Sequence, residues 1–215
     1  CENRAQEIRM STLTVVRHAQ ARPFEADSDR LSDIGELQAR ALREYWSRNG
    51  IAFDEVLCGT LQRHRQTAEL ALGRAAQVSP DWNEYDVDGI LRARPASFAD
   101  PRAFQKEFEI AMQQWLAGSA DGAEPWMAFR DRVLRGLRAV VQGPSNRKVV
   151  LFTSGGPIGV LVQTALDAPE RSFLEVNWRV RNCSITEFVF RADRISLDSF
   201  NGIAHLGDAK LRTFR

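Results

Sequence analysis

Cysteine is scarce in this sequence of 215 residues, and there is no excess of charge of either sign. The three cysteines are Cys1, Cys58 and Cys183, and their odd number and wide spacing predict neither a disulfide framework nor a cysteine-based metal site. The formal net charge of +1 predicts no basic surface for nucleic acid or for an anionic membrane. These absences argue against a disulfide-rich secreted domain and a nucleic-acid-binding protein, and we expect a cytoplasmic location.

Long apolar runs are absent as well. No stretch approaches the roughly 18 apolar residues that a membrane-spanning helix needs, and the polar residues 1–9 lack the apolar core of a signal peptide. We interpret residues 1–9 as an extension or tag and assign residues 10–215 to a single domain. The hydrophobic content of 44% and the charged content of 27% are ordinary for a globular protein with a sizeable core.

Short apolar runs rich in β-branched residues alternate along the chain with segments of helical periodicity. The predicted strands are Leu13–Val16, Glu55–Cys58, the short Gln77–Ser79, Val149–Phe152, Ser184–Phe190 and Ile195–Phe200. The predicted helices are Gly35–Asn49, Leu61–Leu72, Phe98–Leu116, Trp126–Val141 and Gly156–Leu166. This alternation predicts an α/β fold, namely a three-layer α/β/α sandwich with a mainly parallel central sheet. The last two strands are expected to pair as a hairpin at one edge.

Residues 86–124 contain helical and aromatic segments without a clear strand. We interpret this stretch as a small helical cap inserted over the sheet, not as a separate domain. Phe98, Phe104, Phe108 and Trp115 recur in it at roughly helical spacing, which favours a place in the core over contact with a substrate.

Polar residues follow the predicted strands at the points where these strands end. The pair Arg17-His18 comes directly after the first strand, Arg63 opens the helix after the second, and Glu84 follows the short extended segment. Thr153-Ser154-Gly155-Gly156 follows the most apolar strand and opens another helix. Ligands of open α/β folds bind at the carboxyl ends of the strands. Taken alone, Arg17-His18 is better explained by a salt-bridged loop end, and Ser154 by a helix cap; together the features predict one convergent site.

The residue types at these loops suit an anionic ligand. A histidine acts as a nucleophile or base near neutral pH, and the guanidinium fork of arginine matches phosphate oxygens. A helix N-terminus and a glycine-rich turn offer backbone N–H groups to an anion. For the carboxylate, Asp81, Asp86 and Asp88 remain alternatives to Glu84 as members of a solvated acidic loop.

Four segments in this order resemble the histidine phosphatase superfamily, whose fold is phosphoglycerate mutase-like. Val16-Arg17-His18-Ala19 resembles the Arg-His-Gly signature after the first strand, with alanine in the glycine position. Residues 61–68 match Leu-x-Arg-x-x-Gln-Thr-Ala, preceded by Gly59-Thr60 where Ser-Pro is usual. Residues 31–39 resemble the helix entry Leu-Thr-x-x-Gly-x-x-Gln-Ala, and residues 201–206 resemble a frequent C-terminal stretch. The order and spacing of the four together are more specific than any one of them.

The resemblance implies a role for each residue. His18 would attack phosphorus and become phosphohistidine, Glu84 would protonate the leaving oxygen and then activate water, and Arg17 and Arg63 would hold the phosphoryl oxygens. No metal and no cofactor is implied, and the partner would be a small phosphorylated substrate. Nothing in the sequence indicates an oligomeric state.

The chain departs from the family pattern at one position that bears on catalysis. The resemblance places a second histidine, which donates to a phosphoryl oxygen, in the turn where this chain has Ser154. Loss of one such donor costs about 10²–10³ in rate. We expect Ser154 and Gly155 to contribute to phosphate binding, and Ser154 also to cap the following helix. His64 and His205 are interpreted as structural or rim residues.

Three functions therefore follow as hypotheses. The first is a metal-independent phosphatase that acts on a small phosphomonoester through His18. The second is a phosphoglycerate mutase, which usually carries longer closing segments than this chain has. The third is a protein with weakened catalysis that retains phospho-ligand binding, suggested by Ser154.

Overall fold

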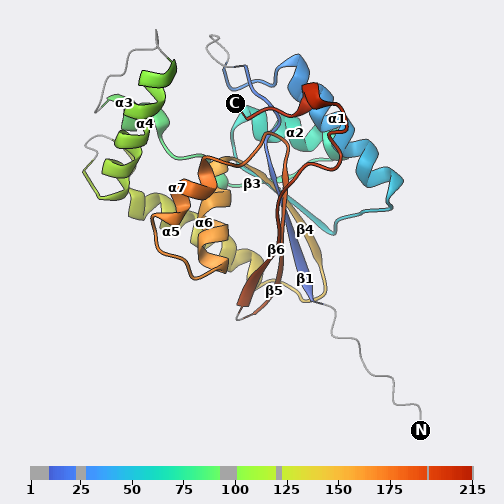
Figure 1. Cartoon of the computed structure of the whole chain (residues 1–215). Coiled ribbons are helices and arrows are strands. Elements are labelled where there is room, and N and C mark those ends of the chain that lie inside the picture. The colour runs from blue at the N-terminus through green and yellow to red at the C-terminus, as the bar shows by residue number, and fades with distance from the viewer. Residues whose placement is uncertain (1–9, 23–27, 93–100, 120–122, 193, 215) are drawn as a thin grey trace.

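The computed structural model describes residues 10–22, 28–92, 101–119, 123–192 and 194–214. The extension or tag assigned to residues 1–9 lies outside the described residues. In the described part of the chain, six strands form one sheet in the order β3-β2-β4-β1-β5-β6 (Figure 1). The strands are β1 (Ser11–Arg17), β2 (Glu55–Cys58), β3 (Gln77–Val78), β4 (Lys148–Thr153), β5 (Ile185–Arg191) and β6 (Arg194–Gly202).

The sheet is parallel except at one edge. Strands β3, β2, β4 and β1 run parallel to one another, whereas β5 runs antiparallel to both β1 and β6. In the register of β1, Val15 lies opposite Leu151 of β4 on one side and Thr186 of β5 on the other. The predictions of a mainly parallel sheet and of a terminal hairpin at its edge are confirmed.

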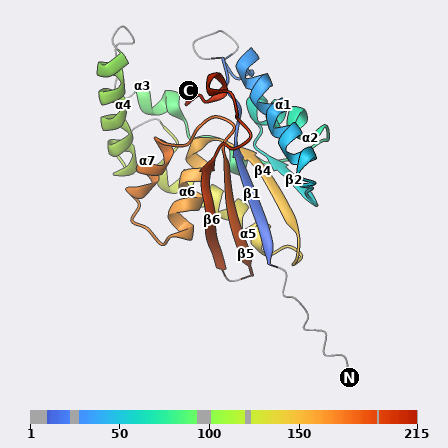
Figure 2. The same ribbon diagram turned by 45° about the vertical axis from the view of Figure 1, so that its right-hand side comes forward.

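Helices cover both faces of this sheet (Figures 1 and 2). They are α1 (Asp33–Arg48), α2 (Gln62–Leu72), α3 (Val87–Arg92), α4 (Pro101–Leu116), α5 (Trp126–Val141), α6 (Gly155–Ala165) and α7 (Ser172–Asn177). Because side chains alternate along a strand, Leu13 and Val15 of β1 pack in one apolar cluster with α5 and α6. Val16 faces the other way and packs in a second cluster with α1 and α2. The predicted three-layer sandwich is confirmed.

The longer helices agree with the periodicity of the sequence. Helix α5 has the predicted bounds, and α1 begins at Asp33 because Ser32 caps it by accepting a hydrogen bond from the Gly35 N–H at 3.1 Å. Helices α3 and α7 were not predicted, since six residues each are too few to show a helical period. None of the helices described is long and apolar enough to cross a membrane.

Helix α4 joins the main core through aromatic side chains. The ring of Trp115 lies 5.4 Å from that of Trp126 in α5 and 6.2 Å from that of Phe173 in α7. Phe108 and Trp115 are buried, as their spacing predicted, and Phe104 packs against the same cluster. Phe98, the expected start of this helix, lies outside the described residues. The interpretation of residues 86–124 as an inserted cap stays a prediction.

Candidate active site

The nucleophile candidate, His18, stands where β1 ends at the middle of the sheet. Its backbone N–H donates to the Thr153 carbonyl of β4 at 2.7 Å, and its Nδ1 lies 2.8 Å from the carbonyl oxygen of Ala19. A carbonyl only accepts, so Nδ1 carries the proton and Nε2 keeps its lone pair. Burial lowers the pKa of His18 well below its usual value, and the charges of Arg63 and Arg17 lower it further. At neutral pH the ring is therefore an uncharged nucleophile.

The loop after His18 is fixed by side chains from α1 and α2. The Ala19 N–H donates to Thr67 Oγ1 at 3.0 Å, and the Gln20 N–H donates to Gln38 Oε1 at 2.8 Å. Gly35 is required here, since a Cβ on it would lie 2.1 Å from the Gln20 carbonyl oxygen. The Gln-Thr and Gly-x-x-Gln segments noted in the sequence thus hold the nucleophile loop in place.

Two arginines flank His18. The Arg17 guanidinium donates to the carbonyl oxygens of Val180 and Phe214. Arg63, in the first turn of α2, donates to Asp29 at 2.7 Å. Both arginines also act electrostatically on Glu84, so the same two positive charges influence the nucleophile candidate and the acid candidate.

Glu84 is held by backbone N–H groups. Its Oε1 accepts hydrogen bonds from Gly156 N at 2.9 Å and from Tyr85 N at 3.2 Å. Burial raises the pKa of Glu84 above its usual value, and Arg63 and Arg17 partly oppose that rise. A carboxyl group with a raised pKa is suited to donating a proton near neutral pH.

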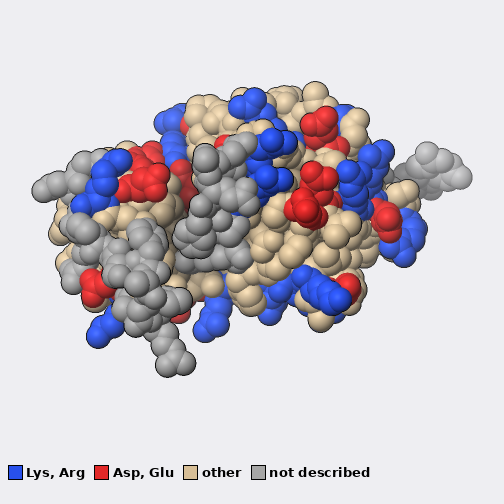
Figure 3. Space-filling model, turned by 90° about the horizontal axis from the view of Figure 1, so that it is seen from above, with Lys and Arg blue, Asp and Glu red and all other residues tan. Residues whose placement is uncertain are grey.

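One open cleft of about 720 Å³ contains these four side chains. Its lining consists of Arg17, His18, Ala21, Arg22, Ser28, Arg63, Glu84, Tyr85, Val87, Gln105, Phe108, Asn177, Trp178, Arg179, Asn182 and Phe214. The alternatives to Glu84 do not line it: neither Asp81, Asp86 nor Asp88 is among the lining residues. Figure 3 looks down on the end of the molecule where the parallel strands terminate, and basic and acidic side chains are interspersed there.

The structure places Ser154 and Gly155 outside the cleft lining, although we expected them to contribute to phosphate binding. Both are buried, and neither is among the residues that line the cleft. Ser154 occupies the N-cap position of α6, but its hydroxyl makes no capping hydrogen bond. It lies instead 2.7 Å from Nε2 of His64, whose ring centroid is 5.7 Å from that of His18. His64 is thus a buried, hydrogen-bonded residue next to His18 that does not line the cleft, which agrees with the structural interpretation and not with a place on the rim.

Sequence reasoning missed the residue that holds the Glu84 loop, which is Arg132 in α5. Its guanidinium donates to the carbonyls of Asn83 at 2.8 Å and of Glu84 at 2.9 Å, and it pairs with Glu124 at 2.7 Å. No motif marks this arginine, because its partners are carbonyl groups that any sequence carries. Asn177, Trp178 and Arg179 of the cleft were missed as well, since α7 was not predicted.

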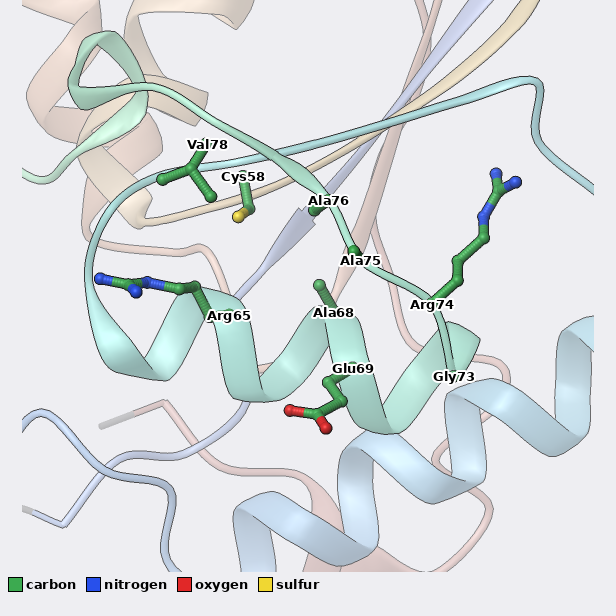
Figure 4. A pocket seen from close by; sticks show the side chains of 9 residues that line it. All are labelled: Cys58, Arg65, Ala68, Glu69, Gly73, Arg74, Ala75, Ala76 and Val78. Carbon is green, nitrogen blue, oxygen red and sulfur yellow. The ribbon is translucent and has the colours of Figure 1, made fainter.

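A second cleft, of about 350 Å³, lies between α2 and the short edge strand β3 (Figure 4). Cys58 is buried beside it, and the two arginines that line it, Arg65 and Arg74, donate to the backbone carbonyls of Thr60 and Phe53. It contains no histidine, so its residues offer no position for a phosphohistidine. Within the described ranges, no group of three or more histidine, cysteine or acidic residues is arranged to hold a metal ion.

The cleft at the ends of the parallel strands combines an uncharged histidine, two guanidinium groups and a protonatable carboxyl group. These groups are chemically suited to phosphoryl transfer through histidine. The family model of the histidine phosphatase superfamily (branch 1) matches residues 13–202. The chain therefore belongs to this superfamily.

One curated relative is named as a probable mutase, and the solved structures with the same fold include a mutase and a phosphatase. A protein of Erwinia tasmaniensis named "Probable phosphoglycerate mutase GpmB" is 27% identical over 94% of this chain and 98% of its own length. Two solved structures share the fold at 20% sequence identity. Phosphoglycerate mutase of Bacillus anthracis has a TM-score of 0.70, and the match covers 95% of this chain and 100% of the other. Phosphoserine phosphatase of Entamoeba histolytica in complex with phosphoserine has a TM-score of 0.65, and the match covers 92% of this chain and 100% of the other. The fold is thus shared by both activities.

Proposed function

We propose that this chain is a phosphatase that hydrolyses a small phosphomonoester through a phosphohistidine intermediate on His18, without a metal ion or cofactor. The observation that carries the proposal is the hydrogen bond from His18 Nδ1 to the Ala19 carbonyl, which leaves Nε2 unprotonated in a cleft shared with Arg17, Arg63 and Glu84. A buried uncharged imidazole with a free lone pair beside two positive charges is suited to attack on an anionic phosphoryl group.

In the first step, His18 Nε2 attacks phosphorus and the bond from phosphorus to the ester oxygen breaks. Glu84 gives its proton to that oxygen, so the product leaves as an alcohol. In the second step, Glu84, now a carboxylate, takes a proton from water as the water oxygen attacks phosphorus and the bond to Nε2 breaks. Arg17 and Arg63 hold the phosphoryl oxygens and stabilise the spread of negative charge in both transition states.

The substrate class follows from the cleft and from the relatives. Structures of the Entamoeba histolytica phosphatase contain phosphoserine or 3-phosphoglyceric acid, and a cleft of about 720 Å³ accommodates molecules of that size. We therefore expect a small phosphorylated metabolite-like ester.

The test is release of inorganic phosphate from a panel of phosphomonoesters that includes phosphoserine and 3-phosphoglycerate. The unaltered protein should release phosphate and form a base-stable, acid-labile phosphoenzyme, and His18→Ala should abolish both. His205→Ala, which replaces a buried histidine outside the cleft, is the matched control and should keep both. Equal phosphate release by His18→Ala and the unaltered protein would contradict the proposal.

Phosphoglycerate mutase is the second candidate, favoured by the Erwinia tasmaniensis relative and the Bacillus anthracis structure. A mutase uses the same phosphohistidine but must return the phosphoryl group to a bound intermediate before water attacks. Interconversion of 3- and 2-phosphoglycerate with negligible phosphate release would decide for the mutase. Binding of phosphorylated ligands without any turnover dependent on His18 would decide for a binding protein with weakened catalysis.

A further inference from the structure

His64 is a buried histidine that the proposed reaction leaves without a role. It follows Arg63 in the first turn of α2 and is fully buried. Its Nε2 lies 2.7 Å from Ser154 Oγ, and its Nδ1 has no hydrogen-bond partner in the described part of the molecule. An orphaned buried N–H is rarer than an orphaned acceptor, so the proton belongs on Nε2, which donates to Ser154.

Two positions that, by the resemblance, depart from the family pattern meet at this ring. Ser154 stands in the position of the second histidine, and Gly59 stands where serine is usual. A Cβ on Gly59 would lie 2.2 Å from His64 Nδ1, so a side chain at position 59 is incompatible with the His64 ring as placed. The His64 ring therefore fits because residue 59 lacks a side chain and residue 154 has a small one that accepts its hydrogen bond.

The same ring lies next to the nucleophile. Ser154 directly follows Thr153, which is paired with Arg17 in the register of β4 and β1, and the centroids of the His64 and His18 rings are 5.7 Å apart. A histidine side chain placed at position 154 would start from the end of β4 and compete with His64 for this space. We therefore expect room for one imidazole beside His18, from either α2 or the β4–α6 turn.

We propose that His64, hydrogen-bonded to Ser154, supplies the second imidazole of this site from α2, in place of a histidine in the β4–α6 turn. His64 is a positioning residue: its Nε2–H fixes the Ser154 hydroxyl, and its ring sets the polar environment behind His18. Ser154 is buried and does not line the cleft, so the pair acts on the reaction through the position of His18 and of the N-terminus of α6. The inference rests on the proposed phosphohistidine chemistry, and it predicts that residues 64 and 154 are functionally interchangeable as sources of the ring.

The experiment is a double-variant cycle on kcat/KM for phosphate release. His64→Ala should lower kcat/KM by about 10²-fold, because a small displacement of a catalytic group costs about that much. Ser154→His alone should also lower it, because two rings compete for one space. The double variant His64→Ala with Ser154→His should recover to within about tenfold of the unaltered protein, because one ring is again present beside His18; such coupling is typical of residues in contact.

Two further measurements separate this role from packing. His64→Phe keeps an aromatic ring but no donor, and it should weaken binding of orthovanadate, which mimics the transition state, more than binding of inorganic phosphate. His205→Phe, the same exchange at a buried histidine outside the cleft, should change neither. The inference would be overturned if the losses of kcat/KM in the two single variants multiplied in the double variant. Unchanged binding of vanadate by His64→Phe would also overturn it. If the unaltered protein shows no His18-dependent turnover, the proposed function fails instead, and vanadate binding still tests the pair.

Discussion

Replacing Gly156 by alanine is expected to displace the carboxyl group of Glu84. A Cβ at this position would lie 2.1 Å from Glu84 Oε1, 2.7 Å from Tyr85 Cδ1 and 3.0 Å from Phe129 Cζ. The Gly156 N–H is also one of the two backbone donors to Oε1. The added methyl group would therefore displace the carboxyl group that the backbone N–H of the same residue binds.

The magnitude follows from what is lost. A hydrogen bond to a charged group contributes about 1.5–3 kcal/mol, and each ~1.4 kcal/mol corresponds to a factor of ten. We therefore expect kcat/KM to fall by about 10- to 100-fold. Glycine to alanine at a compatible site stabilises a protein by about 0.4–1 kcal/mol, but overpacking a buried site costs about 1–3 kcal/mol, so Tm should fall as well.

The assay compares phosphate release and thermal unfolding of Gly156→Ala with those of Gly207→Ala. Gly207 has no atom within 4 Å of an added Cβ and no left-handed φ, so its variant should keep both the rate and Tm. A Gly156→Ala protein that retains full activity and melts at a higher temperature would refute the reasoning. The added methyl group would then stabilise α6 without displacing the carboxyl group of Glu84.

Three other predictions concern charge and pH. Arg132→Met should lower the folding stability by about 2–3 kcal/mol and reduce kcat, because the carbonyls of the Glu84 loop lose their donor. The control, Arg135→Met on the same helix, removes only an exposed ion pair with Asp81 and should leave Tm unchanged in thermal melts. The pKa of Glu84 is raised and the proposed acid must be protonated, so kcat/KM should fall as pH rises through that pKa; Glu84→Gln should lower the rate about 10²–10⁴-fold and remove this dependence in a pH–rate profile. Burial lowers the pKa of His205 from 6.5 to about 4. The neutral ring therefore stabilises the fold above pH 6.5 by up to about 3 kcal/mol, and this stability is lost as pH falls from 6.5 through 4. Urea unfolding at acid pH should show a smaller loss of folding stability in His205→Phe than in the unaltered protein.

Much of the fold is predictable because buried strands and amphipathic helices leave periodic patterns. The apolar run in β4 and the spacing in α5 identify those elements, and the polar pair after β1 identifies the nucleophile candidate. The candidate site residues at strand ends are predictable for a related reason, since the topology of the sheet brings Arg17, His18 and Glu84 to one edge.

Contacts between side chains of distant elements are not predictable in this way. The pairing of His64 with Ser154 depends on how α2 is rotated against the end of β4, and no local pattern encodes that rotation. Arg132 was missed because it binds carbonyl oxygens, which carry no sequence signal. Helices α3 and α7 were missed because short helices are stabilised by tertiary packing more than by their own sequence.

The hydrogen bond from Arg17 to the carbonyl of Phe214 joins residues 197 positions apart. Gln38 likewise donates to the carbonyl of Leu211 at 2.7 Å and to Thr213 at 2.9 Å. Contacts of such sequence separation form slowly, because the loop between them must close before they stabilise anything. The arginine beside the nucleophile candidate thus gains these hydrogen bonds only when the C-terminal segment docks at the end of β1, a step that we expect late in folding, as we do for the pairing of β1 with β5.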